Sequence, residues 1–170
     1  MEFAKIVLLS IVASICYGIV HDQVTARICV EYFSVFHPPV FPTANPTLLA
    51  LGWGVIATWW LGAFLGVVLA ISARFGDRRK ITARELARPV LRLLAVMALS
   101  ALFFGTTGYV LARRGLIAPP EWVTERLDRS SYNAFMADWW AHNASYAAAT
   151  LGGVALCVMT YRKRIDAHVE

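Results

Sequence analysis

The segment ADWWAHNASY, residues 137–146, holds the side chains best suited to chemistry. Asp138, His142 and Tyr146 recur at every fourth position, so on a helix they share one face. A carboxylate and an imidazole one helical turn apart can supply two metal ligands from a single rigid element. The pattern therefore predicts a site on that face, although the segment opens a long apolar stretch.

A second polar stripe lies near the N-terminus. Ser10, Ser14, Tyr17 and His21 follow steps of four, three and four residues, which again places them on one face of a helix. Polar groups in an apolar helix seek protein partners rather than lipid. We therefore expect this stripe to face the interior and to end beside the segment 137–146.

These groups together predict a transition-metal site, because imidazole and carboxylate suit zinc or iron and imidazole also suits copper. The predicted metal ligands are His21, Glu31, His37, Asp138 and His142. Glu31 is also the candidate general base that would take a proton from a metal-bound water. The residues expected to orient a ligand or a water are Tyr17, Asp22, Tyr32 and Tyr146.

Other interpretations of the same residues stay open, because the DxxxH spacing is common by chance. A purely structural network is one, in which Asp138 caps a helix, His142 bonds to Glu31 and His37 is a surface residue before a proline turn. A ligand or proton pathway is another. Haem with His21 and His142 as axial ligands is less favoured.

The composition indicates the environment of the site. Hydrophobic residues make up 58% of the 170 residues and charged residues 16%, whereas an ordinary soluble domain carries about 25% charged residues. We therefore predict an all-α, polytopic integral membrane protein. A spanning helix needs about 20 mostly apolar residues, and four stretches qualify: about 3–20 or longer, 48–73, 90–112 and 137–161. With no convincing internal repeat, residues 1–170 are expected to form a single four-helix transmembrane domain.

Small residues recur along three of the predicted spans. The seams are Ala50, Gly54, Thr58, Gly62, Gly66 and Ala70; Ala98, Ala101, Gly105, Gly108 and Ala112; and Ala141, Ser145, Ala149 and Gly152 or Gly153. Such seams allow helices to approach closely in lipid. We interpret them as packing faces of a bundle, with a groove for a flat cofactor or a lipid as the alternative.

Two long connections, residues 21–47 and 113–136, are rich in aromatic and aliphatic residues, so both are expected to be structured. The first should continue the preceding helix until Pro38, and the second should contain a short helix after Pro120. A separate short helix is expected over residues 82–88, in the basic turn between the second and third spans.

The distribution of basic residues predicts the orientation. If both termini are cytoplasmic, eleven of the sixteen lysines and arginines lie on the inner side, which agrees with the positive-inside rule. We therefore expect a multi-pass protein of the plasma (inner) membrane, whose long connections and site face the periplasm. The charge lies in short turns beside the spans, so nucleic acid is not expected as a partner.

Three classes of function are compatible with these features. The favoured one is a metal-binding or metalloenzyme site at the extracytoplasmic face of the bundle. A non-enzymatic subunit or assembly factor, bound to a membrane-protein partner or to further copies of itself, is the alternative, and the six tryptophans suit such surfaces. An oligomeric transporter or channel is the third, although no charged residue lies deep within a span.

Overall fold

A computed structural model describes residues 1–166, and this part of the chain is helical without any strand. Four segments are long and apolar enough to cross a membrane, as predicted. They are α1 (Glu2–Ile28), α3 (Pro46–Ile56) together with α4 (Trp59–Arg74), α5 (Ala83–Arg113), and α7 (Tyr132–Asp166). The shorter elements are α2 (Val30–Ser34), α6 (Glu121–Thr124) and the 3-10 turn η1 (Arg129–Ser131).

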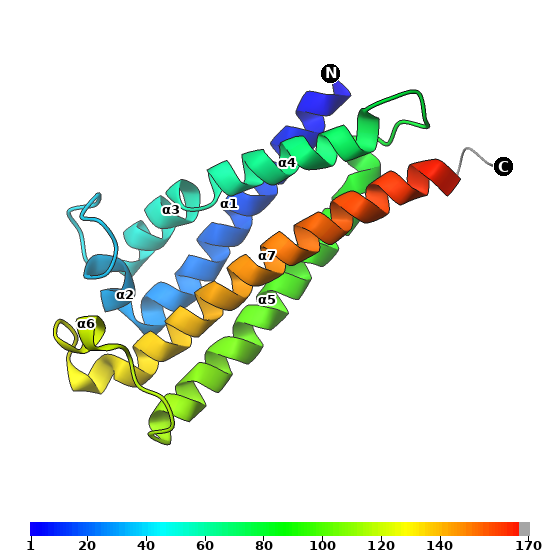
Figure 1. Cartoon of the computed structure of the whole chain (residues 1–170). Coiled ribbons are helices and arrows are strands. Elements are labelled where there is room, and N and C mark those ends of the chain that lie inside the picture. Colours follow the sequence, from blue (N-terminus) through cyan, green and yellow to red (C-terminus); the bar gives the residue numbers. More distant parts are fainter. Residues whose placement is uncertain (167–170) are drawn as a thin grey trace.

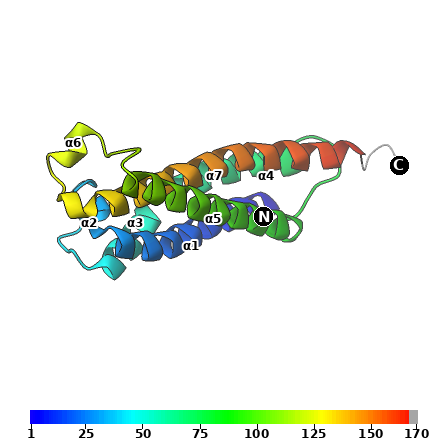
Figure 2. The ribbon, with the colours of Figure 1, turned by 90° about the horizontal axis from the view of Figure 1, so that it is seen from below.

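The long helices run side by side and divide the molecule into two ends (Figure 1). The start of α1, the end of α7 and the turn between α4 and α5 lie at one end, which we call the terminal end. The short helices α2 and α6 lie at the opposite end, which we call the connection end (Figures 1 and 2). Both long connections are therefore on the same side of the bundle.

Helix α1 packs closely on α3 and α4 through the small residues of the second predicted seam. A Cβ atom on Gly54 would lie 2.6 Å from the backbone of Ile19, and one on Gly66 would lie 2.8 Å from Cβ of Ser10. Ala50 and Ala70, at the two ends of this seam, are fully buried. The packing face predicted along residues 50–70 is confirmed.

Helix α5 packs in the same way on α7. A Cβ on Gly105 would meet Cβ of Ala141 at 3.1 Å, and one on Gly108 would lie 2.7 Å from the carbonyl oxygen of Met136. Ala98, which we predicted to belong to this seam, is exposed instead. The small-residue seam of α5 therefore includes Ala101, which is 7% exposed, but not Ala98.

The second span is broken at residues 57–58, which the sequence did not predict. The hydroxyl of Thr58 donates to the carbonyl oxygen of Gly54 over 2.6 Å, and such bonds back to the preceding turn bend helices. A Cβ on Gly18 of α1 would lie 2.6 Å from both Gly54 O and Thr58 Cγ2. The break therefore lies where α1 and α3 approach most closely.

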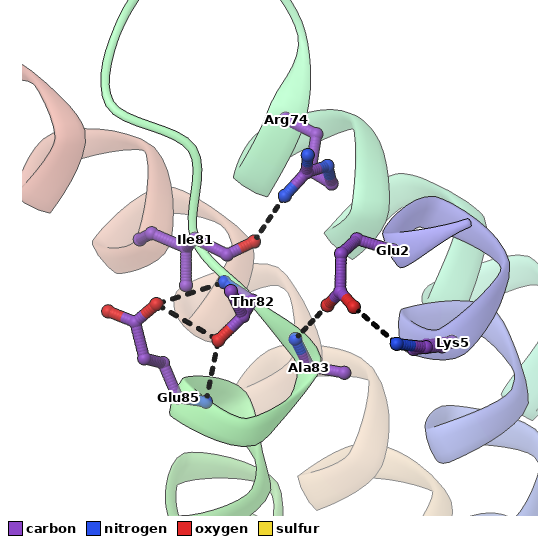
Figure 3. Close-up of polar contacts among 7 residues, drawn as sticks. All are labelled: Glu2, Lys5, Arg74, Ile81, Thr82, Ala83 and Glu85. Carbon is purple, nitrogen blue, oxygen red and sulfur yellow. Dashed lines mark hydrogen bonds and ion pairs between the residues drawn. The ribbon is translucent and has the colours of Figure 1, made fainter.

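At the terminal end, a capping box of Thr82 and Glu85 starts α5 (Figure 3). The carboxylate of Glu2 accepts the amide of Ala83 at 3.2 Å and the ammonium group of Lys5 at 2.7 Å. The predicted separate helix over residues 82–88 is therefore wrong: these residues are the first turns of α5, which continues through Pro89.

Arg164 of α7 closes the turn between α4 and α5. Its guanidinium group is fully buried and donates to the carbonyl oxygens of Ser72, Phe75 and Arg79 at 2.8, 2.8 and 2.6 Å. Carbonyl groups at the end of a helix have no partner within the helix. Arg164 thus supplies the hydrogen-bond donors that the end of α4 requires, although it lies in a distant part of the chain.

At the connection end, the chain differs from the prediction in one place. We expected α1 to continue until Pro38, but it ends at Ile28, and Cys29 is extended with φ −143° before α2 begins. Cys29 packs with Val123, Leu127, Phe135 and Met136 in a small core under α6. The short helix predicted after Pro120 is present as α6.

Candidate metal centre

Three side chains from two distant helices meet near the connection end. His21 and Asp22 lie on α1 and His142 lies on α7, and one potential ligand atom from each falls within 4.8 Å of the other two. Asp22 and His142 are buried, with exposed fractions of 6% and 8%, and His21 is half-buried. We call these three residues the His–Asp–His cluster.

The hydrogen bond on one side of the His142 ring determines what the other side can do. Nδ1 of His142 lies 2.8 Å from the carbonyl oxygen of Asp138. Because a carbonyl oxygen only accepts, Nδ1 carries the proton and Nε2 presents a lone pair in the neutral ring. That lone pair faces Oδ1 of Asp22 at 3.4 Å. Two acceptors at this distance need a cation or a proton between them.

His21 is the third potential metal ligand of the cluster. Its Nε2 is buried and has no hydrogen-bond partner among the described residues. The imidazole stacks on Tyr17, with ring centroids 5.6 Å apart, and meets the His142 ring edge to face at 4.6 Å. Since buried polar atoms are nearly always satisfied, this nitrogen points to a missing ligand.

Aromatic rings cover the cluster from the connection end. Tyr32 stacks on His142 with centroids 4.5 Å apart, and Phe33, which is 2% exposed, lies 5.6 Å from the same ring. Both come from α2, which the extended backbone of Cys29 turns back toward the bundle. The break after α1 therefore places an apolar cover over the histidines.

His37 is near the cluster but does not belong to it. Its Nδ1 donates to the carbonyl oxygen of Tyr32 at 2.7 Å, and its ring packs on Trp53 with centroids 4.6 Å apart. Burial lowers the pKa of His37, while the bond to the Tyr32 carbonyl opposes this shift. His37 is thus a half-buried packing residue rather than a surface residue before the proline turn.

Glu31 also lies outside the cluster. Its Oε2 is the partner of the Cys29 thiol at 3.5 Å, so the predicted bond from His142 to Glu31 is absent among the described residues: His142 faces Asp22 instead.

Burial also changes the acidity of two neighbouring groups in this connection. It is the main cause that raises the pKa of the Cys29 thiol to about 12, and it likewise raises the pKa of the Tyr32 phenol.

Asp138 lies one turn before His142 and is fully buried. The interpretation of Asp138 as a helix cap is wrong, because α7 begins at Tyr132 and Asp138 is within the helix. Its backbone carbonyl orients the His142 ring, whereas both carboxylate oxygens lack a hydrogen-bond partner within residues 1–166. Asp138 therefore orients His142 through its backbone, while its carboxyl group lies outside the cluster.

The tyrosines that we predicted as supporting residues have different positions. The hydroxyl of Tyr17 is 2.7 Å from that of Ser145, so this pair joins α1 to α7 one turn from the histidines. Tyr146 is 42% exposed at the side of the bundle. Tyr32, as described above, covers the cluster.

The sequence predicted His21 and His142 at one site, and the structure brings them together. Asp22 was expected only to orient a ligand, yet one of its carboxylate oxygens lies within 4.8 Å of a ring nitrogen of each histidine. The one sequence feature that could have indicated this role is that Asp22 directly follows His21, the last residue of the polar stripe. Trp53 and Phe33 were not predicted near the site, because neither belongs to a polar pattern.

The donor set of the cluster restricts the chemistry available to it. Two imidazoles and one carboxylate are the ligands of catalytic zinc sites and of non-haem iron sites with open positions. Two ligand atoms bound about 2.1 Å from a tetrahedral ion lie roughly 3.4 Å apart, which matches the distance from His142 to Asp22. Haem does not fit between His21 and His142, because their rings touch.

Comparisons with models of protein families, with curated proteins and with solved structures give no match to this chain.

Proposed function

We propose that this chain is an integral membrane protein that binds a zinc or iron ion through His21, Asp22 and His142. The observation that carries the proposal is the approach of Nε2 of His142 to Oδ1 of Asp22 at 3.4 Å, with a ring nitrogen of His21 in the same group of potential ligand atoms, all within 4.8 Å of one another. A metal ion satisfies all three atoms at once.

The surroundings of the cluster agree with this role. A metal-bound histidine usually donates its other ring N–H to a carbonyl or carboxylate, which fixes its orientation, and His142 does so to the carbonyl of Asp138. Three protein ligands leave a coordination position for a water or a substrate oxygen. A metal ion there would polarise such an oxygen or lower the pKa of a bound water.

The distribution of charge supports an orientation in which the terminal end is cytoplasmic. Eleven of the sixteen lysines and arginines lie there, and Figure 1 shows the start of α1, the end of α7 and the turn between α4 and α5 on that side. In this orientation the positive-inside rule is obeyed. The metal centre then lies in the outer half of a plasma (inner) membrane, toward the periplasm.

Elemental analysis of the purified protein tests the metal centre. We expect about one zinc or iron ion per chain, and replacing any ligand in the variants His21→Ala, Asp22→Ala and His142→Ala should lower the content roughly tenfold or more at limiting metal. The matched control is His37→Ala, which removes a nearby imidazole outside the cluster. Wild-type protein without metal, or equal content in all four variants, would refute the proposal.

A further inference from the structure

A narrow cavity extends from the metal centre into the bundle. It begins at His21, Asp22 and His142 and reaches Cys157 near the terminal end. Along α1 its wall runs from Asp22 to Ser10, which is roughly 18 Å at 1.5 Å per residue. The open volume of about 100 Å³ is spread over this length, so the cavity is a channel rather than a chamber.

The walls of the channel offer few free polar groups. The hydroxyl of Ser10 donates to the carbonyl of Ile6 and that of Thr58 to the carbonyl of Gly54. The hydroxyls of Tyr17 and Ser145 bond to each other. The remaining surface is mostly aliphatic, with Leu65, Leu94 and Met97 among its residues. Apolar cavities of this kind stay dry and accept apolar ligands.

The channel is closed at the connection end, and we place its opening at the side of the bundle. Phe33 and Trp53, which are 2% and 7% exposed, line it beyond the histidines. Of all the lining residues, Tyr146 is the most exposed, at 42%. It lies one turn beyond His142 on α7. In the proposed orientation this opening faces the hydrocarbon of the bilayer.

We propose that the channel binds the alkyl chain of a single-chain lipid whose oxygen-bearing head group reaches the metal centre. The inference rests on the proposed function, since the metal ion is what receives the head group. Ligand sites are mostly apolar with a few polar groups that fix orientation, and the His–Asp–His cluster at one end of an aliphatic channel has this form. A single chain enters from the membrane beside Tyr146.

Photocrosslinking tests the channel. Hexadecanol with a photoreactive group in its chain is added to the purified protein in phospholipid nanodiscs, and the labelled residues are mapped by mass spectrometry. We expect labels on channel residues such as Leu65, Met97 and Ala149, and competition by plain hexadecanol but not by added diacyl phospholipid. Labels confined to residues outside the channel would overturn the inference, as would a channel that fills with water and takes no label.

A pair of matched variants gives the second measurement. Ala149→Phe fills the channel, whereas Ala155→Phe makes the same change at an exposed position of the same helix. Labelling should fall about tenfold in the first and remain in the second. Equal labelling of both variants would contradict the inference.

The metal content of the same samples separates this inference from the proposed function. Ala149 lies seven residues from His142, so Ala149→Phe should keep its metal while it loses the label. Wild-type protein with metal but without channel labels would refute the lipid alone. Channel labels in a protein without metal would refute the metal centre and, with it, the binding of the head group there.

Discussion

At the scale of single residues, His142 is the point at which three helices meet. Its ring contacts His21 of α1 and Tyr32 of α2, and its Nδ1 is bonded within α7. Neither nitrogen of this ring is left to solvent. A histidine held in this manner on both sides has one orientation, which is what a metal ligand requires.

The residue types of the cluster could be predicted from spacing, but the ligand set could not. Successive side chains on a helix point about 100° apart, so spacing alone does not place His21 and Asp22 at the same site. In the structure, ligand atoms of both lie within 4.8 Å of one of His142. Glu31 and His37 lie outside the cluster, beyond the break at Cys29 that follows α1. No local sequence pattern indicates this break.

Cys29 gives a prediction at this scale. With only Cys29 retained in a Cys16→Ser, Cys157→Ser background, the folded protein should react with iodoacetamide far more slowly than the unfolded protein at pH 9. The reason is that Cys29 is 1% exposed and its pKa is raised from 9.0 to about 12, and only the thiolate reacts. Mass spectrometry of the alkylated protein measures both rates.

The same shift in pKa predicts the sign of a pH dependence. The folded state holds the thiol proton between pH 9 and 12, where the unfolded state releases it, so stability is full below pH 9 and falls as pH rises through this window. Rapid alkylation of Cys29 in the folded protein at neutral pH would contradict its buried position.

At the scale of elements, the apolar spans and the packing seam of α3 and α4 followed from periodicity, because burial and small side chains leave a regular pattern. The break at residues 57–58 did not, since the apolar run continues through it. It coincides with the bond from the Thr58 hydroxyl to Gly54 and with the close contact of Gly18 with Gly54 and Thr58, and that contact depends on tertiary packing. Likewise, nothing local predicts that Arg164 caps α4.

Arg164 gives the prediction at this scale. Arg164→Ala removes the hydrogen bonds to the carbonyl oxygens of Ser72, Phe75 and Arg79, so we expect the free energy of unfolding to fall by about 2 kcal/mol and protease cleavage within residues 75–82 to increase. Arg164→Lys should be intermediate, because an ammonium group supplies fewer aligned donors. Thermal unfolding in detergent, with limited proteolysis, measures both effects.

The control for this experiment is Arg162→Ala, which removes an exposed arginine two residues away in the same helix. If Arg162→Ala and Arg164→Ala lowered stability equally, the contribution would be one of charge, and the capping role of Arg164 would be wrong.

At the scale of the whole molecule, the fold consists of two closely packed pairs, α1 with α3 and α4, and α5 with α7, with the channel and the metal centre between them. Small residues bring the members of each pair together. The two pairs meet through fewer small residues, and the larger side chains there leave the channel. The sequence predicted the packing seams, with a groove for a flat cofactor or a lipid only as the alternative. The space between the two pairs of helices depends on how the pairs cross, which no local pattern shows.

The proposed orientation gives the prediction at this scale. A cysteine placed at Glu125, in the connection of α6, should react with a membrane-impermeant maleimide in intact cells, whereas one placed at Asp77, in the turn between α4 and α5, should react only after the cells are opened. Both residues are exposed, so accessibility depends only on the side of the membrane. The reverse pattern would mean the opposite orientation and a metal centre facing the cytoplasm.

The central claim is that His21, Asp22 and His142 hold a metal ion, and X-ray absorption at the metal edge of the purified protein tests it most directly. We predict a spectrum with nitrogen and oxygen ligands at about 2.0–2.2 Å, including outer scattering from two imidazoles. The scattering of one imidazole should disappear in His142→Ala that has been loaded with excess metal. A spectrum with sulfur at about 2.3 Å, or protein that carries no metal to measure, would contradict the account.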